Sequence, residues 1–234
     1  MDFIILGGGC FGSFYTRQLL RAQKFLSFQT IHIVDIKKDC QAFLEHGDGA
    51  GKIVYNIQDW KDFFLPYFRE KINDVRLGKP IEDHYVPPTF APHVLMEVFL
   101  DIFQKDFPLV KIGPEPMIDL LKTPVDMALP NGTRALSFAT WMCPASCIEP
   151  PTCPHTGGPK DWDMKDYLQN IKTPLYVFQC RHLAMGVGTI PVQEIVNEYL
   201  RFEKQVSQSG THSVSMASVS SCHGLIGQVK IENV

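Results

Sequence analysis

The stretch FIILGGGCFG at residues 3–12 joins a short apolar strand to a glycine-rich turn, and this junction determines the fold that we expect. Gly7 permits a tight turn, Gly9 lets the backbone approach a pyrophosphate, and Gly12 allows the following helix to pack closely on the strand. The N–H groups at the start of that helix, together with the positive end of its dipole, attract an anion without any basic side chain. The stretch predicts the first half of a dinucleotide-binding βαβ unit.

The residues after the turn agree with this prediction. Apolar residues recur at helical spacing over residues 11–24, which predicts an amphipathic helix, and IHIVD at 31–35 is typical of a strand that ends in an acid. Asp35 lies close to the expected distance of roughly 20 residues after the glycines, where a carboxylate accepts ribose hydroxyls. The alternative is a structural turn without a ligand. The predicted cofactor-binding residues are Gly7, Gly9, Cys10, Phe11, Gly12 and Asp35.

On Gly7, Gly9, Gly12 and Asp35, the stretch resembles the NAD(P)-binding Rossmann superfamily, and within it the TrkA N-terminal type of nucleotide-binding domain. The resemblance covers about the first half of the chain. It implies a doubly wound, mostly parallel sheet and a bound nucleotide. The likeness to TrkA domains further implies a sensing module that regulates a partner protein.

Asp35 also bears on the choice of cofactor. A carboxylate at the adenosine ribose repels the 2′-phosphate that distinguishes NADP from NAD, so NAD is favoured. Lys37 and Lys38 follow at once and offer two ammonium groups to such a phosphate, which keeps NADP as an alternative.

The composition describes an ordinary globular chain. It has 234 residues, of which 45% are hydrophobic and 20% charged, and a formal net charge of −3, so it can bury a full core in one domain or two small ones. No run approaches the roughly 20 apolar residues of a membrane helix, and Asp2 stands where an export signal would be basic. We therefore expect a cytoplasmic protein without a membrane span. The absence of basic stripes argues against a nucleic-acid partner, and a homo-oligomer is left open.

Residues 1–115 alternate between strands and helices as a dinucleotide-binding domain would. The predicted elements after residue 35 are strands at 52–56, 83–86 and 109–112 and helices at 60–68 and 91–103. Gly113 and Pro114 are expected to end the last strand. Such alternation is typical of a parallel sheet covered on both faces.

Residues 116–234 follow a different pattern. We expect a short helix at 117–121, strands at 135–140, 175–179 and 212–221, and a helix over 192–202 that follows Pro191. This half forms either extra strands on the same sheet or a small second lobe.

A proline-rich segment at 141–155 gathers Cys143, Cys147, Cys153 and His155 with the spacing C-x3-C-x5-C-x-H. A chain without an export signal is expected to keep its thiols reduced, so such a cluster indicates a metal or redox site. Three sulfur donors and an imidazole can surround Zn²⁺, or hold an iron–sulfur cluster with a ligand from elsewhere. The alternatives are a loop of small apolar cysteines and a thiol redox switch.

Two further groups follow strand-like runs, namely Cys180-Arg181-His182 and Cys222-His223. Ligands of open α/β sheets collect beyond the carboxyl ends of the strands, so Cys180, His182 and His223 are the predicted catalytic residues of a substrate crevice. A histidine there would carry the proton that accompanies hydride transfer, and Arg181 would hold a substrate carboxylate. The alternative is that both histidines only satisfy local backbone groups.

Three functions are compatible with these features. The first is an NAD(P)-dependent oxidoreductase that acts on a small-molecule substrate and carries a metal in its cysteine segment. The second is a non-catalytic nucleotide sensor that regulates a protein partner. The third is S-adenosylmethionine-dependent methyl transfer, which the lack of an acid next to the glycine turn disfavours.

Overall fold

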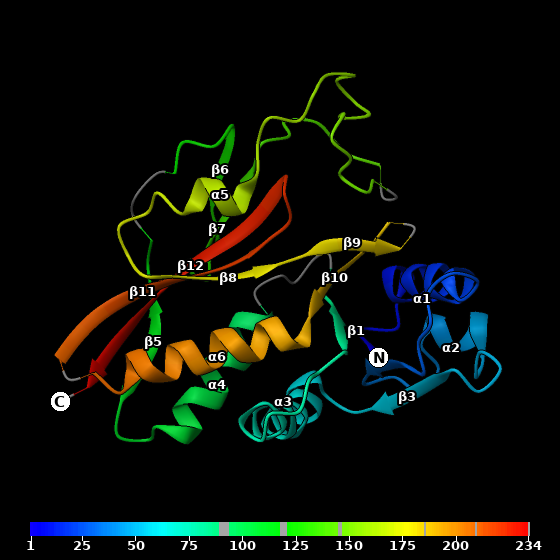
Figure 1. The fold of residues 1–234 in the computed structure, drawn as a ribbon, viewed down its shortest axis with the longest axis horizontal. Coiled ribbons are helices and arrows are strands. Elements are labelled where there is room, and N and C mark those ends of the chain that lie inside the picture. Colours follow the sequence, from blue (N-terminus) through cyan, green and yellow to red (C-terminus); the bar gives the residue numbers. More distant parts are fainter. Residues whose placement is uncertain (89–93, 118–120, 145–146, 185, 209, 234) are drawn as a thin grey trace. The chain divides into compact units, whose positions relative to one another are not determined.

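The computed structural model describes all residues except 89–93, 118–120, 145–146, 185, 209 and 234. The described residues form a mixed α/β structure with six helices and two mixed sheets (Figure 1). They divide into two compact units. The first comprises Met1–Ala91 and His182–Asn197, and the second comprises Pro92–Arg181 and Glu198–Val234. Residue 115, the domain boundary expected from the sequence, is the last residue of a strand in the second unit.

The first sheet has the strand order β3-β2-β1-β4-β10-β9. Strands β1 to β4 run parallel, and β10 pairs antiparallel with β4. The strands are β1 (Phe3–Leu6), β2 (Ile31–Asp35), β3 (Ile53–Ile57), β4 (His84–Val86), β9 (Arg181–Ala184) and β10 (Val187–Pro191), and the helices of this part of the chain are α1 (Cys10–Ala22), α2 (Gln41–His46) and α3 (Trp60–Arg76). The core forms because Phe3, Ile5 and Ile31 of neighbouring strands are fully buried with Leu19 of α1.

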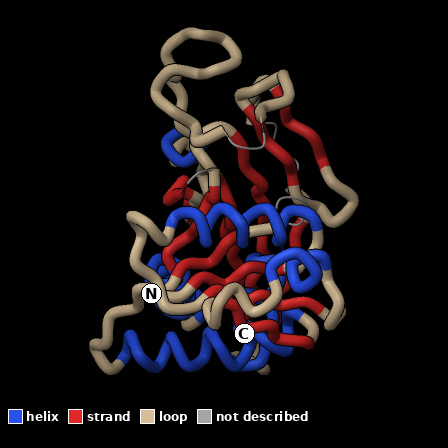
Figure 2. The backbone as a smooth tube through the Cα atoms, turned by 90° about the vertical axis from the view of Figure 1, so that its right-hand side faces the viewer, coloured by secondary structure: helices blue, strands red, loops and turns tan. Residues whose placement is uncertain are grey.

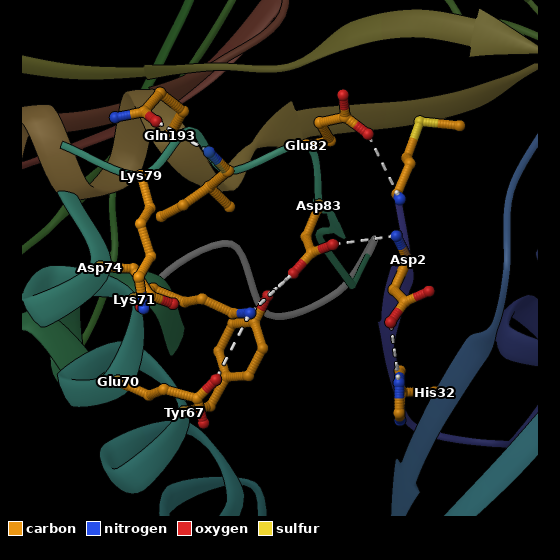
Figure 3. A network of polar contacts seen from close by, with 12 residues as sticks. Asp2, His32, Tyr67, Glu70, Lys71, Asp74, Lys79, Glu82, Asp83 and Gln193 are labelled. Atoms are coloured by element: carbon orange, nitrogen blue, oxygen red, sulfur yellow. Dashed lines mark hydrogen bonds and ion pairs between the residues drawn. The ribbon is translucent and has the colours of Figure 1, made fainter. Parts of the chain in front are cut away.

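A polar network fastens the amino ends of β1 and β4 to α3 (Figure 3). Asp83, just before β4, accepts hydrogen bonds from the Asp2 backbone N–H (3.0 Å) and the Tyr67 hydroxyl (3.0 Å), and its carboxylate lies 3.1 Å from Nζ of Lys71. Burial would raise the pKa of Asp83, but the Asp2 N–H and Lys71 outweigh it and hold that pKa below its ordinary value. The network fixes the strand ends opposite the glycine turn.

The second sheet has the strand order β6-β7-β12-β11-β8, with β5 also paired to β12. All of its pairs are antiparallel except β8 with β11. The strands are β5 (Lys111–Glu115), β6 (Val125–Ala128), β7 (Arg134–Ser137), β8 (Leu175–Gln179), β11 (Gly210–Val219) and β12 (His223–Asn233), and the helices are α4 (Val94–Asp106), α5 (Met164–Leu168) and α6 (Val192–Val206). Helix α4 packs on α6 through Phe103, whose ring stacks on Tyr199 with centroids 4.4 Å apart.

Between β7 and α5 the described residues form a long loop without helices or strands, drawn in tan at the top of Figure 2. One isolated bridge joins Thr152 to Pro159 in this loop. The cysteines at 143–153 lie here, so their placement depends on side-chain contacts with the rest of the second unit and not on a regular element.

Several sequence-based expectations differ from the structure. Strand β5 does not end at Gly113 and Pro114 but runs through them, because β5 pairs only with β12 in the described residues and an edge strand tolerates a missing N–H. The sequence predicts a mostly parallel sheet. Among the described residues, parallel pairing occurs only within β1–β4 and between β8 and β11. Residues 116–234 were expected to form either extra strands on the same sheet or a second lobe. They contribute β9 and β10 to the first sheet and also most strands of the second sheet. Residues 118–120 of the helix expected at 117–121, and the expected start of a helix at 91–92, lie outside the described residues.

The structure also bears on membrane insertion. Among the described residues, no helix has the length and apolar character that crossing a bilayer requires.

Candidate functional site

The glycine turn follows β1 directly and is held by backbone hydrogen bonds. The Gly7 N–H donates to the Val34 carbonyl (2.8 Å), and Gly7 has φ +80, a left-handed conformation that favours glycine. The Gly8 carbonyl accepts the Ala42 N–H at 2.8 Å. The turn is therefore fixed to β2 on one side and to α2 on the other.

Gly12 sets how closely α1 approaches the turn. A Cβ on Gly12 would lie 1.9 Å from the Gly7 carbonyl oxygen, so no side chain fits there without movement of the backbone. Gly9 differs, because no described heavy atom lies within 4 Å of the place where its Cβ would be. The backbone is therefore tightly packed where Gly12 meets Gly7, whereas the space beside Gly9 is open.

The start of α1 carries no side-chain cap. Gly9 is the N-cap residue and the first turn of the helix contains no acidic residue. The first N–H groups of any helix lack an intrahelical acceptor, and they carry the positive end of the dipole. This end of α1 is suited to an anion that approaches from the open side of Gly9.

Asp35, the last residue of β2, is positioned by the turn itself. The Gly8 N–H donates to Oδ2 of Asp35 at 2.7 Å, and the Lys37 N–H donates to Oδ1 at 2.8 Å. A carboxylate has about four lone-pair sites, so two hydrogen bonds leave acceptor capacity for ribose hydroxyls. The structure therefore brings Asp35 next to the turn, as the sequence predicts. It also gives Gly8 a role that sequence reasoning missed.

Two contacts behind the turn were not foreseen either. Cys40 packs directly on Gly8, where an added Cβ would meet its Sγ at 2.3 Å. Ser13 of α1 donates to the Glu45 carboxylate and lies 2.9 Å from Nε2 of His46, which ties α1 to α2. Cys10 is exposed at the first position of α1.

In the second unit, Glu149 joins the cysteine segment (residues 141–155) to the turn between β11 and β12. Its carboxylate accepts hydrogen bonds from the Ser220 hydroxyl (2.6 Å), the Ser221 N–H (2.9 Å) and the Ser221 hydroxyl (2.7 Å). Lys160 adds a second link, since its ammonium donates to the Glu149 carbonyl (3.0 Å) and to Oγ of Ser221 (2.8 Å). The segment is thereby fixed to this turn although the two are far apart in the sequence.

The cysteines of this segment have different environments. Burial raises the pKa of Cys143, and the nearby thiols of Cys147 and Cys153 add to the rise. The backbone N–H groups of Thr156 and His155, which point at Cys153, lower the pKa of that thiol. His155 itself stacks on Trp141, with ring centroids 4.8 Å apart and planes at 6°. Within the described ranges, no group of three or more His, Cys, Asp or Glu side chains is already arranged to hold a metal ion.

Residues 94–232 match the model of the family AF_1314_C, whose description reads "Uncharacterized protein, C-terminal domain". The chain belongs to this family. The match to AF_1314_C includes the cysteine segment, the turn between β11 and β12 and the strands of the second sheet except the last residue of β12, whereas the glycine turn and Asp35 lie before it. Comparison with curated proteins and with solved structures gave no match.

The predicted catalytic residues lie in both units. All three lie within the AF_1314_C region, but Cys180 and His223 belong to the second unit and His182, on β9, belongs to the first. Burial raises the pKa of Cys180 to about 12, so its thiol is protonated at neutral pH. Burial lowers the pKa of His223, against an opposing effect of Glu149, and Nδ1 of His223 lies 3.0 Å from the Ser137 hydroxyl.

The position predicted for Cys222 and His223 at the end of a strand was wrong. Cys222 and His223 do not end the strand that precedes them, because β11 stops at Val219 and His223 is the first residue of β12. The two residues belong to a hairpin turn whose hydroxyls bind Glu149. Through these contacts Glu149 joins the cysteine segment to the hairpin turn.

Proposed function

We propose that the first unit is an NAD(P)-binding Rossmann domain and that Gly7, Gly9, Cys10, Phe11, Gly12 and Asp35 bind a dinucleotide, NAD in preference to NADP. The observation that carries this proposal is the hydrogen bond from the Gly8 N–H to Asp35. It sets a carboxylate for the ribose beside an uncapped helix start suited to the pyrophosphate.

The topology of the first sheet supports the proposal. The order β3-β2-β1-β4 with parallel pairing puts β1 in the interior of the sheet, followed at once by the turn and α1. Ligands of open α/β sheets bind beyond the carboxyl ends of such strands. The glycine turn lies at this end of β1, and Asp35 lies at the same end of β2.

The residues present fit the dinucleotide. The open space at Gly9 allows the pyrophosphate to come close to the backbone, and the oxygens of Asp35 can accept both hydroxyls of the adenosine ribose. The same carboxylate would repel a 2′-phosphate. We therefore expect NADPH to bind more weakly than NADH, although Lys37 and Lys38 follow Asp35.

The activity that we favour is that of an oxidoreductase that acts on a small molecule, with Cys180, His182 and His223 as its proposed catalytic residues and a metal in the cysteine segment. Bound NAD would supply hydride chemistry, and His182 of the first unit would carry the accompanying proton. A regulatory nucleotide sensor is the second candidate. It is favoured by the pKa of Cys180, which burial raises to about 12, because a protonated thiol is not an activated nucleophile.

Isothermal titration calorimetry of the full chain with NADH, NADPH and S-adenosylmethionine tests the binding proposal. We expect heat of binding with NADH, weaker binding with NADPH and none with S-adenosylmethionine. Gly9→Ala supplies a matched variant, since its methyl group points into open space and leaves the fold intact but obstructs the pyrophosphate. We expect it to weaken NADH binding at least about tenfold, a loss of about 1.4 kcal/mol.

The outcomes separate the candidates. NADH oxidation in the presence of electron acceptors supports the oxidoreductase, whereas tight binding without turnover supports the sensor. Binding of S-adenosylmethionine alone would replace both with methyl transfer. If none of the three ligands binds, the nucleotide proposal is wrong.

A further inference from the structure

The turn between β11 and β12 brings a fourth cysteine to the cysteine segment. Cys222 lies in this turn, which Glu149 and Lys160 join to the segment through Ser221. The Cys222 carbonyl accepts the Phe138 N–H at 3.0 Å, close to where the loop with the segment leaves β7. All of these residues belong to the second unit, so their arrangement is part of one compact body.

One thiol of this region, that of Cys143, is near enough to three other thiols to interact with each of them. Cys143 interacts electrostatically with Cys147 and Cys153, and Cys222 interacts with Cys143. Two of the remaining cysteines, Cys10 and Cys40, belong to the first unit. The hairpin turn thus completes a set of four sulfur donors from two segments that are distant in the sequence.

N–H groups are already directed at three of these sulfurs. The Glu149 N–H donates to Sγ of Cys147 at 3.4 Å, and the Trp162 indole N–H donates to Sγ of Cys222 at 3.4 Å. Backbone N–H groups of the residues after Cys153 bond to its thiol. Such bonds favour a negatively charged sulfur and orient it, which is the role of the outer shell around a metal thiolate site.

The fourth donor expected from the sequence, His155, has a different environment. Its ring lies flat on Trp141, at a centroid distance of 4.8 Å and an angle of 6°. This stacking gives His155 a packing role at the edge of the segment. Cys222 carries an N–H···S bond and interacts with another thiol of the cluster, so it is the better candidate for the fourth ligand.

We propose that Cys143, Cys147, Cys153 and Cys222 bind one structural Zn²⁺, an inference that rests on the metal part of the proposed function and names its ligands. Four protein ligands close the coordination shell, which is typical of a structural and not a catalytic zinc site. Each thiol gives up its proton on binding, so Zn²⁺ and four thiols yield a tetrathiolate complex of charge −2 and four protons. The ammonium of Lys160, bonded to Ser221 next to Cys222, compensates part of that charge.

Binding also makes a structural demand. Zn–S distances are about 2.3 Å, and the donors are not yet arranged around a common centre in the described residues. The ion must therefore draw the sulfurs of the segment toward Cys222. The prolines at 144, 150, 151 and 154 limit the freedom of the unbound loop and reduce the entropy that this closure costs.

The test is zinc content and affinity of the full chain, purified under reducing conditions without chelators. We expect elemental analysis to find one zinc per chain. Competition with a chromogenic chelator measures the zinc affinity, which should fall at least about 100-fold in Cys222→Ser. His155→Ala should keep the affinity within about threefold. Cys10→Ser, an exposed cysteine of the first unit, is the matched control and should not change it.

A rescue variant keeps the test decisive if Cys222→Ser folds poorly. Cys222→His supplies a nitrogen ligand in place of the sulfur, so it should recover zinc binding. Cobalt titration of the apo form of this variant should show weaker thiolate charge-transfer bands than the wild type. Full zinc in Cys222→Ser, together with its loss in His155→Ala, would overturn the ligand assignment while the metal part of the proposed function stands. A wild-type chain that takes up neither zinc nor cobalt would overturn both.

Discussion

The substitution Gly12→Ala tests the close packing behind the glycine turn. The added Cβ would lie 1.9 Å from the Gly7 carbonyl oxygen and 3.0 Å from its carbonyl carbon, so the turn and the start of α1 must separate. Steric overpacking costs typically 1–3 kcal/mol, and contact with rigid backbone favours the upper end, about 3 kcal/mol. The helical propensity of alanine returns about 0.5–1 kcal/mol, which leaves a net destabilisation of about 2 kcal/mol.

Urea unfolding of the full chain, followed by far-ultraviolet circular dichroism, measures this loss. For a chain of 234 residues, about 2 kcal/mol corresponds to a fall in Tm of about 4–8 °C. Gly9→Ala is the control, because Gly9 has φ −72 and open space at its Cβ, and the change at this N-cap position should cost no more than about 1 kcal/mol. If Gly12→Ala unfolds at the wild-type urea concentration, the packing described for the turn is incorrect.

Three further predictions follow from named contacts. Asp35→Asn removes the charge beside the turn and should lower the ratio of the NADPH and NADH dissociation constants, measured by calorimetry, at least about fivefold. If this ratio is unchanged, Asp35 is not part of the ribose site. Asp83→Ala removes the carboxylate that accepts from the Asp2 N–H, the Tyr67 hydroxyl and the Lys71 ammonium. It should lower the free energy of unfolding at pH 7, measured by urea unfolding, by about 2–3 kcal/mol. Because the folded pKa of Asp83 is lowered, its contribution is present above the ordinary carboxyl pKa of about 3.9 and is lost as pH falls through the folded value, so wild type and variant should converge in acid and diverge toward neutrality. Glu149→Gln should loosen the cysteine segment and speed limited proteolysis within it, and equal cleavage rates in both proteins would contradict the joining role of Glu149.

The sequence predicts β1, β2 and β8 well because their signals are local. The bounds of β1 and β2 agree with expectation, since each is a short apolar run next to glycine or charged residues, and β8 agrees for the same reason. Helix α6 begins where Pro191 places it. The contact between Asp35 and the turn could be expected because the spacing of the βαβ unit implies it.

The elements that sequence reasoning missed depend on distant partners. Strand β12 contains Gly224 and Gly227, which weaken a strand pattern, but the space beside Gly227 is filled by Met96 of α4. The short strands β9 and β10 surround Gly186 and have too few residues for a clear alternation. The roles of Glu149 and Cys222 arise only when the β11–β12 hairpin folds onto the cysteine segment, and no local pattern encodes that contact.

A crystal structure of the protein grown with saturating NADH would show whether the glycine turn and Asp35 form a dinucleotide site. We expect the pyrophosphate against the first N–H groups of α1 beside Gly9, with both adenosine ribose hydroxyls bonded to Asp35. Crystals in which the turn stays empty, or in which NADH binds at another place, would contradict this expectation.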